Sequence, residues 1–146
     1  MYDRDMVKFM IDELTNVGFK ELSTPEQVAQ AIPAKGTNLL VVNSVCGCAA
    51  GKARPGVIHS LKNKNVPTNL YTVFAGLDID ATDKARSLIK GYPPSSPSIA
   101  MFKDGELVFM LERHMIEGKD AESISMLLRA AFDKFCGAKE EVAQTV

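Results

Sequence analysis

Two cysteines separated by one glycine are the residues of this sequence best suited to chemistry. Cys46, Gly47 and Cys48 directly follow an aliphatic run, TNLLVVN at 37–43, and precede a segment with helical character. Where a strand leads into a helix, free backbone N–H groups and the helix dipole favour an anion, so a thiol there loses its proton more easily. Because the thiolate is the reactive form, this placement predicts Cys46 as a nucleophile.

The neighbours of Cys46 fit the same chemistry. Gly47 is expected to let the chain turn without a side chain that shields the sulfur. Cys48 is close enough to attack a mixed disulfide on Cys46, because residues two apart can meet the usual Cα separation of about 4.4–6.8 Å. Lys52 and Arg54, a turn or two further along, are candidates for added positive potential.

A metal site is the first alternative. A C-x-C pair can form half of a zinc site, but structural zinc takes four ligands, typically from two such pairs. The other candidates, Cys136, His59 and His114, are scattered and unpaired in the sequence. Two rival functions stay open: a metal-carrier or redox-sensing module that uses Cys46 and Cys48 with Cys136, and an adaptor that keeps the fold without the chemistry.

The surrounding sequence predicts strands that position the cysteines. Residues 37–43 and 70–75 are short aliphatic runs typical of buried strands, and 49–62 between them can form a helix interrupted by glycine and proline. Strands joined in this way should lie parallel. Residues 98–103 and 107–111 flank Asp-Gly, a strong hairpin signal. The result is an α/β domain with a mixed sheet of about four strands and helices on both faces.

Further helices are expected at 2–17, from Ser23 or Thr24 to before Pro33, at 83–90 and at 120–135. The first helix carries apolar residues at helical spacing, and we expect their side chains to be buried: Met6, Phe9, Met10, Leu14 and Val17. We also expect most of the methionines elsewhere in the chain, Met126 among them, to be buried.

Length and composition fit one compact domain over residues 1–146, with 137–146 as a frayed tail. The 17 basic and 18 acidic residues give no field that favours nucleic acid or a membrane surface. No apolar run approaches the roughly 18 residues of a membrane span, and the first residues do not resemble a signal peptide. We therefore expect a cytoplasmic protein, in a reducing environment where a structural disulfide is unusual.

The segments LLVVNSVCGCAAGKARPG, YTVFAG, PPSSPSIAMFKDGELV and ERHMIEG together resemble the bacilliredoxin family, over residues 5–136. The resemblance implies a thioredoxin-like fold and the reduction of mixed disulfides between protein cysteines and a low-molecular-weight thiol, usually bacillithiol, with some disulfide-isomerase activity. Protein clients and the small thiol are the implied partners. No cofactor or metal is implied.

The same resemblance assigns roles to individual residues. Cys46 matches the family's nucleophile and Cys48 its second cysteine. Pro97 matches the cis-proline that faces the site in thioredoxin-like folds, where the Ser96 backbone would be ready to pair with an extended client. Thioredoxin itself uses C-x-x-C, so the C-x-C spacing departs from that of a general disulfide reductase.

Overall fold

A computed structural model describes residues 2–137 and contains a five-stranded mixed sheet of order β1-β3-β2-β4-β5. The strands are β1 (Lys20–Glu21), β2 (Thr37–Asn43), β3 (Asn69–Phe74), β4 (Ser98–Lys103) and β5 (Glu106–Leu111). β1, β3 and β2 run parallel, whereas β4 and β5 pair antiparallel. This is the expected α/β architecture with one strand more than expected, because the two residues of β1 are too few to show a period.

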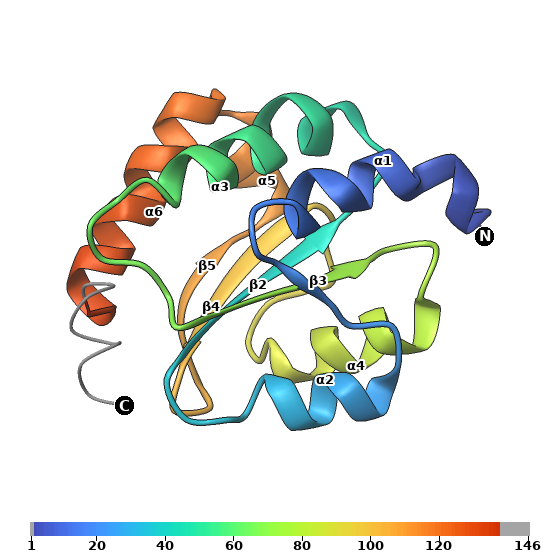
Figure 1. Ribbon diagram of the computed structural model, residues 1–146, viewed down its shortest axis with the longest axis horizontal. Coiled ribbons are helices and arrows are strands. Elements are labelled where there is room, and N and C mark those ends of the chain that lie inside the picture. Colours follow the sequence, from blue (N-terminus) through green and yellow to red (C-terminus); the bar gives the residue numbers. More distant parts are fainter. Residues whose placement is uncertain (1, 138–146) are drawn as a thin grey trace.

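Helices cover both faces of the sheet (Figure 1). Above it in that view lie α1 (Arg4–Thr15), the π-helical turn η1 (Ala49–Ala53), α3 (Arg54–Ser60), α5 (Arg113–Glu117) and α6 (Ala121–Phe135). Below it lie α2 (Pro25–Ala31) and α4 (Ile79–Leu88). None of the helices within residues 2–137 is both long enough and apolar enough to cross a membrane.

The central strand β2 is buried along its whole length. Leu39 and Val41 pack in one core cluster with residues of α3 and α6, whereas Leu40 and Val42 pack in another with residues of α2 and α4. This alternation follows from the period of two in a strand, whose successive side chains point to opposite faces. Covered on both sides, β2 is a rigid support for the loop that follows it.

The hairpin of β4 and β5 forms as the sequence predicts. Asp104 and Gly105 both have positive φ values, 51° and 86°, as a two-residue primed turn requires. At the start of α2 the side chain of Thr24 accepts from the backbone N–H of Gln27, and Gln27 completes the capping box.

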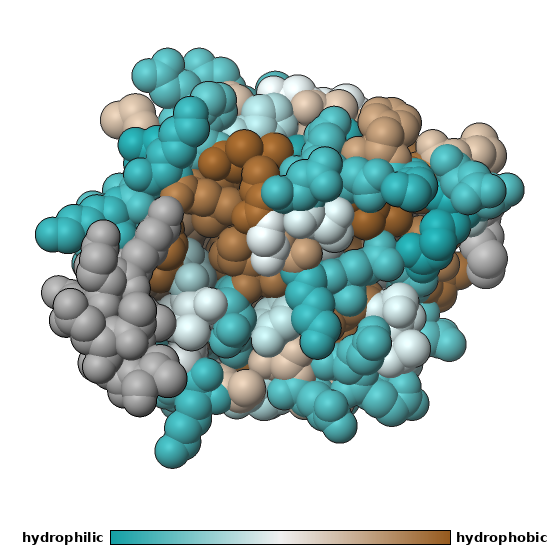
Figure 2. Space-filling model, in the orientation of Figure 1, coloured by the Kyte–Doolittle hydropathy of each residue, from teal (hydrophilic) through white to brown (hydrophobic). Residues whose placement is uncertain are grey.

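Helix α1 forms as expected, but the prediction of its buried face is only partly correct: Leu14 is buried as expected, and Met10 is partly buried. Val7, Ile11 and Leu14 are buried, whereas Met6 and Phe9 are 68% and 60% exposed. Both sets have helical spacing, so the period alone cannot choose between them. Apolar surface accordingly shows among charged side chains over α1 (Figure 2).

Three other expectations need correction or qualification. Val17 lies beyond the end of α1 and is partly exposed, and Met126 on α6 is 65% exposed rather than buried. The short helix α5 was not expected from the sequence. Of the expected frayed tail, residues 138–146 lie outside the part of the chain that the structure describes.

Candidate active site

The C-x-C motif lies where the buried strand β2 gives way to a helical segment. The carbonyl oxygen of Cys46 accepts from the N–H groups of Ala49 and Ala50 at 3.0 and 3.2 Å, which begins the helical chain that continues through η1 and α3. The structure therefore places Cys46 at the junction that the sequence predicts. Both thiols of the motif are free and partly exposed.

The surroundings of the Cys46 sulfur favour a thiolate. Ser44 Oγ lies 3.4 Å from the sulfur and is placed to donate a hydrogen bond to it. Burial raises the pKa of the Cys46 thiol, but the Ser44 hydroxyl, the N–H groups of Ala49 and Cys48 and the charge of Arg113 outweigh it, so the pKa is lowered. A lowered pKa increases the thiolate fraction near neutral pH, as the nucleophile of thiol–disulfide exchange requires.

Arg54 supports the loop from within the protein instead of facing the sulfur. Its side chain is 1% exposed, and its Nε donates to Glu13 Oε2 at 2.7 Å. Its Nη1 donates to Asn43 Oδ1 at 2.9 Å and to the carbonyl oxygen of Ser44 at 3.0 Å. The expectation that Arg54 adds positive potential at the thiol is therefore replaced by a role in fixing the backbone before Cys46.

The positive charge near the thiol comes from Arg113, which the sequence analysis did not single out. Arg113 lowers the pKa of Cys46 electrostatically. Lys52, the other cation expected there, donates from Nζ to the carbonyl oxygen of Glu117. One sequence signal could have found Arg113. In the expected hairpin the strands 98–103 and 107–111 are antiparallel, so the residues that follow the second strand lie next to the residues that precede the first strand. Arg113 is therefore expected near Pro97.

Pro97 is buried, and the Ser96–Pro97 peptide bond is cis, which confirms the expectation for this bond. Ser98, the next residue, pairs with Val42 near the end of β2, so Pro97 lies beside the loop that carries the cysteines. The Ser96 carbonyl oxygen accepts from Arg113 Nη1 at 3.2 Å, and its second lone pair is left for the backbone of an extended client.

Gly47 is exposed, and its φ lies outside the left-handed range. Apart from its two neighbours in the chain, a Cβ built there would meet no atom within 4 Å, so the backbone at this position could also carry a side chain. What glycine provides is open space next to Cys46 in the chain. Cys48, by contrast, packs partly buried against the core between the sheet and α6.

Cys136 lies at the other end of the sheet. Burial raises the pKa of its thiol, and the side chain of Thr37 opposes this rise. Thr37 begins β2 and the motif follows its other end, so the seven residues of the strand, about 20 Å, separate Cys136 from Cys46. Within residues 2–137 no three His, Cys, Asp or Glu side chains are grouped to hold a metal ion. The three-cysteine metal module is therefore wrong.

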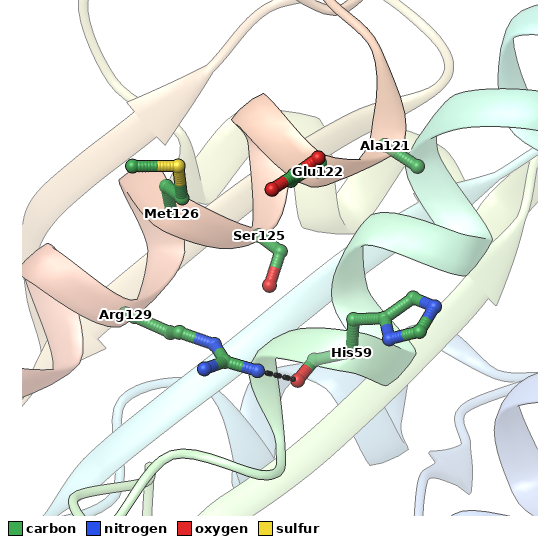
Figure 3. A pocket seen from close by; sticks show the side chains of 6 residues that line it. All are labelled: His59, Ala121, Glu122, Ser125, Met126 and Arg129. Atoms are coloured by element: carbon green, nitrogen blue, oxygen red, sulfur yellow. Dashed lines mark hydrogen bonds between the residues drawn. The ribbon is translucent and has the colours of Figure 1, made fainter.

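A hollow of about 520 Å³ lies between α3 and α6, away from the thiols (Figure 3). Arg129 extends along it and donates to the carbonyl oxygen of His59 at 2.7 Å. Neither Cys46 nor Cys48 lines this hollow. This hollow is therefore separate from the cysteine motif.

Comparison with known proteins identifies the family. The family model described as disulphide isomerase matches residues 2–136. A bacilliredoxin of Cytophaga hutchinsonii is 52% identical over 134 residues, which cover 92% of this chain and 99% of the relative. The chain belongs to the bacilliredoxin family. A bacilliredoxin of Staphylococcus epidermidis is 47% identical, with 93% of this chain and 94% of the relative covered.

Solved structures support the fold. A structure described as having a thioredoxin fold matches with a TM-score of 0.56 at 17% identity, over 77% of this chain and 94% of the other. A thioredoxin of Malassezia sympodialis matches with a TM-score of 0.52 at 14% identity, over 81% and 90% of the two chains. The fold is thioredoxin-like, and bacilliredoxin membership makes the protein a thiol–disulfide oxidoreductase.

Proposed function

We propose that this bacilliredoxin-family protein removes a low-molecular-weight thiol from mixed disulfides with protein cysteines, and that Cys46 performs the exchange. The observation that supports this most is the environment of the Cys46 sulfur: partly exposed, within hydrogen-bonding distance of Ser44 and with a lowered pKa.

In the first step the Cys46 thiolate attacks the sulfur of the small thiol within the mixed disulfide. A disulfide forms between Cys46 and the small thiol, the original S–S bond breaks, and the client leaves as a thiolate that takes up a proton from solvent. Three sulfurs must lie roughly in line for this exchange. The open space beside Gly47 gives a protein-sized disulfide the room to approach.

In the second step the adduct on Cys46 is resolved. The Cys48 thiolate attacks the Cys46 sulfur, which gives a Cys46–Cys48 disulfide and releases the small thiol. Alternatively, a second small-thiol molecule attacks the sulfur of the bound one and leaves Cys46 reduced. Both routes exchange one disulfide for another. In the first route two further small-thiol molecules reduce the Cys46–Cys48 disulfide and leave joined to each other as a disulfide. Thiols are therefore the only co-substrates of either route, and the reaction needs no metal, flavin or nucleotide.

The physiological small thiol that we propose is bacillithiol, since the relatives are bacilliredoxins. The exchange requires a compartment that keeps small thiols reduced, for which we propose the cytoplasm. Disulfide isomerisation is a second candidate activity. It is favoured by the description of the matching family model and by a partly exposed nucleophile that can attack and later release a client disulfide.

The proposed reaction can be tested with a client protein that carries one small-thiol adduct. Incubation with the reduced protein should free the client thiol, whereas Cys46→Ser should leave the adduct in place. Cys136→Ser is the matched control, since that thiol lies about one strand length away, and it should act as the wild type does. Release by Cys46→Ser at the wild-type rate would contradict the proposal.

A further inference from the structure

Arg113 joins the turn at Pro97 to helix α5 and leaves part of its guanidinium unused. Nη1 donates to the Ser96 carbonyl oxygen at 3.2 Å, and Nε donates to Glu117 Oε1 at 2.6 Å. The side chains of Arg113 and Glu117 are 45% and 48% exposed. A guanidinium has five N–H donors, and Nη2 donates to no protein atom within residues 2–137. Donors therefore remain for a ligand from solvent.

The location of these donors suggests which ligand they could meet. Arg113 interacts electrostatically with the sulfurs of both Cys46 and Cys48. It is held at Ser96, directly before the buried Pro97 that flanks the cysteine loop. Arg113 is therefore a cation within electrostatic reach of a small thiol that has formed a disulfide with Cys46.

We infer that Arg113 binds a carboxylate of the small thiol while that thiol moves onto Cys46, which makes carboxylate-bearing low-molecular-weight thiols the preferred co-substrate class. The inference rests on the proposed function. Arginine suits this task because its planar fork can donate two parallel hydrogen bonds to one carboxylate. A neutral small thiol of similar size reacts at the same sulfur without this contact.

The test compares two small symmetrical disulfides on a protein in which Cys48 and Cys136 are both serine, so that Cys46 alone reacts. Dithiodipropionate carries a carboxylate on each half, and hydroxyethyl disulfide is neutral. Mass spectrometry follows the rate of adduct formation on Cys46. Loss of Arg113 also changes the thiolate fraction, but that change affects both disulfides equally and cancels in the ratio of their rates.

In Arg113→Gln the ratio of the anionic to the neutral rate should fall about three- to fivefold, the scale of one exposed charge pair. Arg113→Lys, which keeps the charge without the fork, should lose only part of the preference. Lys103→Gln, which removes one exposed positive charge at the other end of the sheet, is the matched control and should leave the ratio unchanged. High salt should lower the ratio of the anionic to the neutral rate in the protein that keeps Arg113, until it approaches the ratio measured for Arg113→Gln.

An equal loss of rate with both disulfides in Arg113→Gln would overturn the inference, because it would limit Arg113 to an effect on the thiolate. The proposed function would then still stand, since Cys46 would still accept the adducts. If Cys46 of the parent protein reacted with neither disulfide, the proposed function itself would fail, and this inference with it.

Discussion

Arg54 donates a hydrogen bond to the carbonyl oxygen of Ser44 at 3.0 Å, and the hydroxyl of the same serine lies 3.4 Å from the Cys46 sulfur. A fully buried cation thus fixes the residue that contacts the nucleophile. The arrangement separates two tasks: Arg54 holds the backbone, whereas Ser44 favours the thiolate.

Replacing Arg54 with methionine should lower the free energy of unfolding by about 3 kcal/mol, because the Ser44 carbonyl and Glu13 both lose a buried charged partner. Arg129→Met is the matched control. It removes a partly exposed arginine that also donates to a backbone carbonyl, and should cost about 1 kcal/mol. Urea unfolding measures both values, and equal losses would contradict a special role for Arg54.

Ser44→Ala should raise the pKa of Cys46, because the thiolate loses a hydrogen-bond donor. The rate of iodoacetamide labelling at Cys46 should then fall at pH values below the ordinary thiol pKa of about 8.5 and be little changed well above it. Ser125→Ala removes a buried serine hydroxyl on α6 and should leave the pH profile of Cys46 unaltered. An unshifted profile in Ser44→Ala would show that the hydroxyl does not tune the thiol.

Gly47→Ala should preserve or slightly raise stability, since alanine is favoured over glycine in a helical conformation by about 0.5–1 kcal/mol and its Cβ meets no neighbour. The added methyl group should nevertheless slow the reaction of Cys46 with protein-sized mixed disulfides more than with small ones. Gly51→Ala, in the same helical segment and equally unobstructed, is the control and should show no such difference. Equal rates for both client sizes in Gly47→Ala would refute steric access as the role of Gly47.

Cys48→Ser should accumulate the small-thiol adduct on Cys46 when no external thiol is present, because the neighbouring resolving thiol is missing. Added small thiol should restore turnover by attacking the adduct directly. Intact-mass spectrometry distinguishes the two states. Full turnover of Cys48→Ser without external thiol would exclude a resolving role for Cys48.

The parts of the fold and of the site that depend on residues close together in the sequence could be predicted. The buried strand β2 shows as an unbroken aliphatic run, and the hairpin shows as Asp104-Gly105 between two apolar strands, where both turn residues adopt positive φ. Cys46 is found because its residue type and its place between a strand and a helix depend only on its neighbours in sequence.

The features set by tertiary contacts were not predictable. Arg54 lies in a helical segment, where an arginine is ordinarily exposed, and its burial depends on acceptors from α1 and the end of β2. The buried face of α1 could not be chosen because two sets of apolar residues share the same helical spacing. Arg113 gains its role only when the hairpin brings the chain after β5 back to the turn at Pro97.

The most direct test of the mechanism follows one small thiol from a client to its acceptor. A client protein carrying an isotopically labelled small thiol is mixed with the Cys48→Ser variant, and the products are digested and sequenced by mass spectrometry without reduction. Nucleophilic attack by Cys46 on the small-thiol sulfur predicts the label in a disulfide on Cys46, with an equal amount of free client thiol. Label on Cys136, or a client joined covalently to Cys46 with the labelled thiol released, would contradict it.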